Sequence, residues 1–196
     1  MKNMILTVSM LSLMAAAACA GGQARTRDVK FGNYAMDNDY FSCSVPAGWT
    51  LERDKDRDEE YGIYEIQLLA PEPGKAPTSI FVSYYAGNNG DFNGYGDFVK
   101  RNSRNAAGET KTSRELFEPV KNITLAGRKG FELSRKRLVS LHPESKSDES
   151  VQLKEKLYVL PAKEGFYVLH FSAPPAAFKA NLPVFEKIAE SFRGRL

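Results

Sequence analysis

Residues 165–192 read GFYVLHFSAPPAAFKANLPVFEKIAESF, and this stretch decides the fold because its apolar residues change period in the middle. From Gly165 to Ala173 both alternating sets are largely apolar, which is typical of a central strand covered on two faces. Beyond Pro174 the spacing becomes helical, with apolar residues at Phe178, Leu182, Phe185, Ile188, Ala189 and Phe192. We predict a strand followed by a helix, with Pro183 separating a first turn at 176–181 from the main helix.

The chain upstream of this stretch is mostly of period two, the pattern of half-buried strands. The strands that we predict are 40–45, 49–51, 64–68, 79–85, 120–125, 128–141 and 151–161. The polar loop His142 to Ser150 joins the last two, which should pair as an antiparallel hairpin. One short helix is expected from about Asp97 to Asn105, giving about seven strands and two or three helices in one domain.

Length and composition exclude several classes of protein. The 196 residues suit one domain plus a leader, and 42% hydrophobic with 26% charged residues is a globular composition. A net charge of +3 is too even to predict a nucleic-acid partner. Two cysteines and two histidines leave little room for a zinc site or a disulfide framework.

Residues 1–18 have the features of an export signal, a positive Lys2 followed by an apolar run. The next residue completes Ala16-Ala17-Ala18-Cys19, which resembles the lipobox of bacterial lipoproteins, although Ala16 stands where that family usually has leucine. The resemblance implies acylation of Cys19, a membrane anchor through lipid, and, with Ala20 next, an outer-membrane lipoprotein facing the periplasm. Ordinary cleavage after Ala20 is the alternative, and it would give a soluble periplasmic protein. We expect a tether at 19–39 and a globular domain at 40–196.

Three quoted stretches resemble the PsbP-like superfamily: FSCSVPAGW at 41–49, YVLHFSAP at 167–174 and FEKIAESF at 185–192. That group includes extrinsic photosystem II subunits, a yeast Ran-binding import factor and bacterial envelope lipoproteins. The resemblance covers roughly 40–192 and implies an α+β fold, an α/β/α sandwich with a mostly antiparallel sheet and the C-terminal helix packed on it. Its motifs describe packing and carry no chemistry.

No catalytic motif appears in the sequence, which lacks G-x-S-x-G, H-E-x-x-H, S-x-x-K and C-x-x-C patterns. His170 lies in the apolar strand, so we expect a hydrogen-bonded core histidine, with a general base as the alternative. We expect His142 to be solvated in its polar loop. Cys43 alternates with Phe41 and Val45, which predicts a buried, inert thiol.

An acidic run spaces its carboxylates as a calcium loop does. Counting Asp54 as position one puts Asp56, Asp58 and Glu65 at positions three, five and twelve. Position six, which needs glycine, is Glu59, and strand patterns flank the run. The main interpretation is a solvated hairpin tip, and calcium binding is the alternative.

Two further clusters have both a structural and a binding interpretation. Glycines 87, 90, 94 and 96 can form a connector or cradle a phosphate, although their spacing fits neither known phosphate motif. Arg135 and Arg137 on one hairpin strand, with Lys154 and Lys156 on the other, can form a basic patch for a partner, or surface charge that protects a sheet edge.

From these features we expect a non-enzymatic exported lipoprotein that acts as a binding or assembly module at the bacterial cell envelope, with an envelope protein as its partner and no cofactor. The first alternative is an envelope protein that binds a small molecule or calcium. The second is an envelope enzyme whose catalytic groups meet only in the folded chain.

Overall fold

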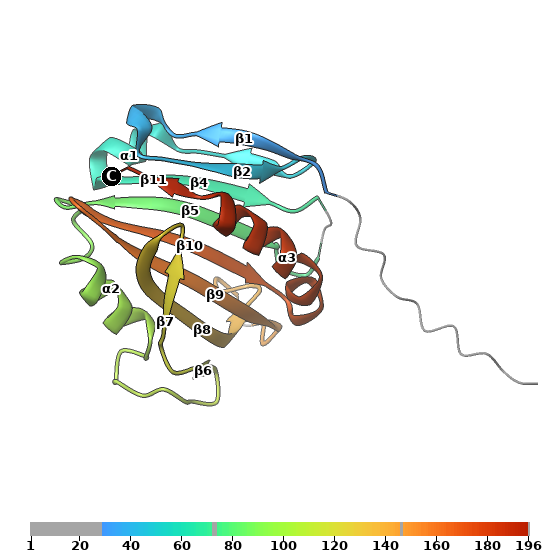
Figure 1. The fold of residues 1–196 in the computed structure, drawn as a ribbon. Coiled ribbons are helices and arrows are strands. Elements are labelled where there is room, and N and C mark those ends of the chain that lie inside the picture. Colours follow the sequence, from blue (N-terminus) through green and yellow to red (C-terminus); the bar gives the residue numbers. More distant parts are fainter. Residues whose placement is uncertain (1–28, 72–73, 146, 196) are drawn as a thin grey trace, which may run out of the picture.

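A computed structural model describes residues 29–71, 74–145 and 147–195 (Figure 1). Its centre is an eight-stranded antiparallel sheet in the order β3-β4-β5-β10-β9-β8-β6, with β7 also paired to β8. The strands of this sheet are β3 (Thr50–Glu52), β4 (Ile63–Leu69), β5 (Ser79–Ala86), β6 (Glu115–Phe117), β7 (Lys121–Leu125), β8 (Arg128–Ser140), β9 (Ser150–Ala162) and β10 (Gly165–Ala173). The predicted antiparallel sheet is confirmed.

The long hairpin and the central strand also follow the prediction. β8 and β9 pair from Phe131↔Val159 to Ser140↔Ser150 across the polar loop. β10 lies between β5 and β9, and most of its residues are buried on both faces. Both alternating sets of β10 are apolar because the strand is central and covered on two faces, as we inferred from the sequence.

A second, three-stranded sheet lies against one face of the large sheet, in the order β1 (Phe31–Ala35), β2 (Phe41–Pro46) and β11 (Arg193–Gly194). β1 and β2 are joined by a short 3-10 turn at Asp37–Asp39. β1 falls inside the segment 19–39 that we expected to be a tether, so the folded part begins earlier than predicted. Gly32 and Asn33 disfavour a strand when taken alone, and pairing with β2 supplies the hydrogen bonds that stabilise β1.

Helix α3 (Pro175–Ser191) packs on the same face as the small sheet and encloses the larger hydrophobic core. Phe185, Ile188 and Phe192 are fully buried there. The helix runs through Pro183 without the break that we predicted. Both Pro183 and Lys179, whose carbonyl loses its helical donor, are exposed, so water can satisfy that carbonyl.

The opposite face of the large sheet carries helix α2 (Tyr95–Asn102) and a smaller core. Phe98 is the buried residue of α2, and it packs against Phe166 of β10. The chain is therefore an α/β/α sandwich, as the sequence resemblance implied. A third helix, α1 (Lys55–Tyr61), contacts β4 beside the sheet. Within the described residues, none of the helices has the length and apolarity needed to cross a bilayer.

Candidate functional site

A hollow of about 610 Å³ opens beside α1, at the β4 side of the large sheet. It draws side chains from the β3–α1 segment, from β4 and β5, and from the loop before α2. The lining residues are Glu52, Arg53, Asp54, Asp58, Tyr61, Ile63, Glu65, Gln67, Tyr85 and Asp91. The volume lies in the range of small-ligand sites, and the lining is more polar than that of most such sites. We call this feature the α1 hollow.

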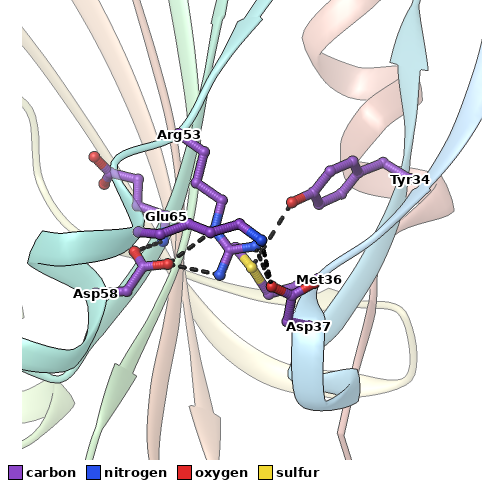
Figure 2. Close-up of polar contacts among 7 residues, drawn as sticks. Tyr34, Met36, Asp37, Arg53, Asp58 and Glu65 are labelled. Carbon is purple, nitrogen blue, oxygen red and sulfur yellow. Dashed lines mark hydrogen bonds and ion pairs between the residues drawn. The ribbon is translucent and has the colours of Figure 1, made fainter.

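Arg53 organises the wall of the α1 hollow (Figure 2). Its Nε and Nη2 donate to Asp58 Oδ2 at 2.8 and 2.7 Å, and its Nη1 donates to Asp37 Oδ2 at 2.8 Å. Only 11% of the Arg53 side chain is exposed, and Asp58 is buried. Because Asp37 belongs to the turn of the small sheet, this guanidinium ties that sheet to α1.

The neighbouring carboxylate, Glu65 on β4, is also held in place. The hydroxyl of Ser83 on β5 donates to Glu65 Oε2 at 2.5 Å, and the Glu65 backbone N–H donates to Asp58 Oδ1 at 3.4 Å. Ser83 is buried, so this bond is shielded from water. Arg53, Asp58 and Glu65 are therefore held in place before any ligand arrives, which lowers the entropy cost of binding to this part of the lining.

The acidic run joins β3 to β4, which pair antiparallel, so it lies at the tip of a hairpin as the main interpretation has it, with Asp58 buried. The calcium-loop alternative for Asp54, Asp56, Asp58 and Glu65 does not fit the structure. Residues 55–61 form helix α1, so the run does not adopt the calcium-loop conformation, although Asp54, Asp58 and Glu65 all line the α1 hollow. Asp58 is bound by Arg53, and Asp56 is exposed. No group of three or more acidic, histidine or cysteine side chains in the described ranges could hold a metal ion.

A buried charge cluster lies on the α2 face of the large sheet, where β8, β9 and β10 adjoin. Glu155 of β9 has no exposed side-chain surface, and it accepts hydrogen bonds from Arg135 Nε and, at 2.8 Å, from Arg137 Nε. Burial alone would raise the pKa of Glu155, but the two arginines and His170 outweigh it and hold that pKa below its ordinary value. Glu155 is therefore a buried carboxylate whose charge is balanced by two arginines of β8.

His170 of β10 borders this charge cluster. Burial lowers its pKa to about 4, and the nearby arginines add to the effect while Glu155 opposes it. Its Nε2 lies 3.8 Å from Glu155 Oε2 and has no hydrogen-bond partner in the described part of the chain. The ring stacks on Phe81, with centroids 5.8 Å apart. The side chain is 21% exposed, so His170 lies at the border of the smaller core, and our prediction of a hydrogen-bonded histidine is wrong for Nε2.

The basic patch does not form, because its members lie on opposite faces of the sheet. Arg135 and Arg137 point to the α2 face, where they bind Glu155. Lys154 and Lys156 belong to the other alternating set of β9 and lie on the α3 face, where Lys156 meets Glu132 at 3.4 Å. Nor is the hairpin a sheet edge, since β8 is flanked by β6 and β7.

Three candidates from the sequence remain: Cys43, His142 and Cys19. Cys43 is buried and free, and burial raises the pKa of its thiol to about 12, which agrees with an inert thiol. His142 is exposed and lies 3.6 Å from Glu149. Cys19, the predicted lipid attachment site, lies outside the described residues.

The glycine-rich segment is organised by Asn89, a residue that sequence reasoning missed. Its Oδ1 accepts from the backbone N–H groups of Asp91 and Phe92 at 3.2 and 2.9 Å, and its Nδ2 donates to the Ala86 carbonyl at 2.7 Å. These amides are therefore occupied within the loop and are not turned toward a phosphate. An Asn before an Asp-Phe pair in a glycine-rich loop is the signal of such a turn.

Comparisons with solved structures identify the fold. The cyanobacterial PsbP of Synechocystis is 14% identical, with 85% of this chain and 94% of that chain covered and a TM-score of 0.53. A Pseudomonas aeruginosa protein of unknown function is 15% identical, with 85% and 98% covered and a TM-score of 0.50. A Bacteroides thetaiotaomicron protein gives 11% identity and a TM-score of 0.51, with 84% of this chain and 48% of that chain covered.

Neither protein-family models nor curated proteins match the sequence. Identities of this size establish architecture and leave activity open. The structural matches nevertheless agree with the packing motifs at 41–49, 167–174 and 185–192 that suggested the resemblance. This chain therefore has the PsbP-like fold.

Proposed function

We propose that this chain is a non-enzymatic binding module of the bacterial cell envelope, exported by its leader and tethered through a lipid on Cys19. The observation that supports a binding role is the α1 hollow, in which Arg53 holds Asp58 and Ser83 holds Glu65 in place. Five carboxylates and one guanidinium line it, so the lining presents mainly hydrogen-bond acceptors. A complementary ligand or partner group is therefore one that donates hydrogen bonds.

The proposed tether rests on Ala16-Ala17-Ala18-Cys19 and on the start of the fold at β1. Several acyl chains on one residue would hold the domain at a bilayer, whereas one chain binds only marginally. Mass spectrometry of the mature protein separates the two cleavage routes. An acylated N-terminal Cys19 supports the proposal, and an unmodified N-terminus at Gly21 contradicts it.

The binding role is tested by photo-crosslinking in the envelope. A photoreactive phenylalanine replaces Tyr61 at the α1 hollow, or Tyr95 on α2 as the control, because the two tyrosines have nearly equal exposure, 41% and 40%. We expect a discrete adduct from position 61 that position 95 does not give. The same adducts from both positions, or from neither, would contradict a site at the hollow.

An enzymatic role is the competing function. Both carboxylate oxygens of Asp58 already accept hydrogen bonds, Oδ2 from Arg53 and Oδ1 from the Glu65 backbone N–H, which does not suit a group that must contact a substrate. Turnover of an envelope substrate by the purified protein, lost in Asp58→Asn or Glu65→Gln while the fold is retained, would overturn the proposal.

A further inference from the structure

β1 is an edge strand that carries no charge. Within the described fold it pairs with β2 alone, so its other side presents unpaired backbone groups. Its sequence is FGNYA, and Gly32, Asn33 and Ala35 are exposed. An accessible strand edge of this kind is a template for pairing with another chain, unless charge or distortion blocks it.

The other edges of the described fold are blocked in this way. β3 contains Glu52, β6 contains Glu115, β7 contains Lys121 and the two-residue β11 contains Arg193. β1 has five residues and none of these devices. The contrast within one molecule indicates that the β1 edge is kept open for pairing.

The backbone of β1 shows which groups face outward. The carbonyl of Lys30 accepts from the Ala47 N–H at 2.7 Å, and the Met36 N–H donates to the Phe41 carbonyl at 2.8 Å. The backbone N–H and C=O groups of the even-numbered residues of β1 therefore point toward β2. Those of the odd-numbered residues point away from it, because the direction of these groups alternates along an antiparallel strand. The N–H and C=O groups of Phe31, Asn33 and Ala35 face the open side.

We propose that β1 pairs antiparallel with β1 of a second copy of this chain, about a two-fold axis at Asn33. Such an axis passes through a residue that faces its own equivalent, and Asn33 is the middle of the three outward residues. Phe31 then pairs with Ala35 of the second copy, and Ala35 with Phe31. Three pairs with two hydrogen bonds each satisfy every outward group of both strands, and the two small sheets become one of six strands.

The side chains of β1 are complementary to themselves in this register. Phe31 lies opposite the second copy's Ala35, and Gly32 lies opposite the second copy's Tyr34, so each cross-strand pair joins a large residue to a small one. A Cβ added at Gly32 would meet nothing within 4 Å, which leaves room beside it. The Asn33 amides face each other and can hydrogen-bond. A strand of unrelated sequence would not gain this match.

This inference goes beyond the proposed function and does not use the α1 hollow. It is tested with Asn33→Cys in the full chain, expressed with its leader and oxidised in its membranes. Equivalent Cα atoms of a hydrogen-bonded pair lie about 5.5 Å apart, within disulfide range. We expect a disulfide-linked species of twice the mass, and its absence would overturn the proposal. A cross-linked species of any other mass would show a different partner and would equally overturn it.

The matched control is Ser44→Cys, since Ser44 pairs with Asn33 on β2 and shares its face. From the strand spacing, two copies of this position lie about 15 Å apart, too far for a disulfide. Cross-linking of Ser44→Cys as efficient as that of Asn33→Cys would contradict the register. The unaltered chain measures the background from Cys19 and Cys43.

A second variant tests the same pairing without a cysteine. Asn33→Lys places two ammonium groups opposite each other at the axis, whereas Asn33→Gln keeps an amide there. In sedimentation of the full chain we expect Asn33→Gln to keep the dimer and Asn33→Lys to weaken dimerisation at least tenfold. An unaltered chain that is monomeric, or an Asn33→Lys variant that dimerises as well as the unaltered chain, would rule the pairing out.

Discussion

The Nε atom of Arg137 lies 2.8 Å from a carboxylate oxygen of Glu155, whose side chain has no exposed surface. Arg135 binds the other oxygen and is 15% exposed, whereas Arg137 is 41% exposed. The cost of breaking this group depends on which member is removed, because only a charge that stays buried without a partner is costly.

Glu155→Gln should therefore be more destabilising than Arg137→Ala, by about 2 kcal/mol, since it leaves Arg135, whose side chain is only 15% exposed, without a counterion. Arg137→Ala should cost less than about 1 kcal/mol, because water screens its exposed end. Urea denaturation of the three proteins at pH 7 measures both effects. An equal loss from the two variants would show that Glu155 is not neutralised as described.

Stability should fall with acidification between pH 6.5 and 4 because of His170. Its folded pKa is about 4, below the ordinary 6.5, so in this window the unfolded chain binds a proton that the folded chain does not. His170→Phe should reduce the loss of unfolding free energy between pH 7 and 4.5 by about 2 kcal/mol. Urea denaturation of both proteins at pH 7 and at pH 4.5 measures this difference, and an equal loss in the two proteins would contradict the prediction.

The Arg53 contacts predict unequal effects for its two acidic partners. Asp58→Asn leaves the nearly buried guanidinium without its closest carboxylate, so we expect a loss of about 2 kcal/mol. Asp37→Asn should cost clearly less, since that carboxylate is 55% exposed. Thermal denaturation compares the two variants. A larger effect from Asp37→Asn would mean that the ion pair with α1 is not the one that stabilises this region.

Gly165 should tolerate no side chain. It has a φ of +118°, and an added Cβ would overlap the carbonyl oxygen of Tyr85 on the neighbouring strand. Gly165→Ala should therefore cost about 3 kcal/mol or more. Gly127 also has a positive φ, +76°, but nothing lies within 4 Å of its Cβ position, so Gly127→Ala should cost only about 1 kcal/mol. Equilibrium unfolding of both variants tests the difference.

The architecture was predictable from sequence because period-two and helical patterns are long in β8, β9, β10 and α3. β1 and α1 were missed in the sequence analysis, for two different reasons. β1 contains Gly32 and Asn33 and depends on β2, while α1 is seven residues of mostly charged sequence, which resembles a polar turn.

The candidate sites were less predictable, because they depend on register. The alternation of side chains could have separated Lys154 and Lys156 from the apolar set of β9 that contains Leu153 and Leu157. That Arg135 lies opposite Glu155, however, is decided by how many residues of the polar loop stay unpaired. The α1 hollow joins segments from residue 52 to residue 91, and no local pattern predicts that meeting.

The three-stranded sheet combines the first and last strands of the described chain, β1 and β11, on either side of β2. A ribosome or a translocation channel that delivers the chain from its N-terminal side would release β1 and β2 long before β11. The large sheet can assemble in the meantime, but Ser42 cannot gain its neighbour Arg193 until residue 193 has been delivered. Closure of the small sheet is thus the last step in the folding of the described residues, and a chain stalled before residue 193 would be left with β2 open on that side.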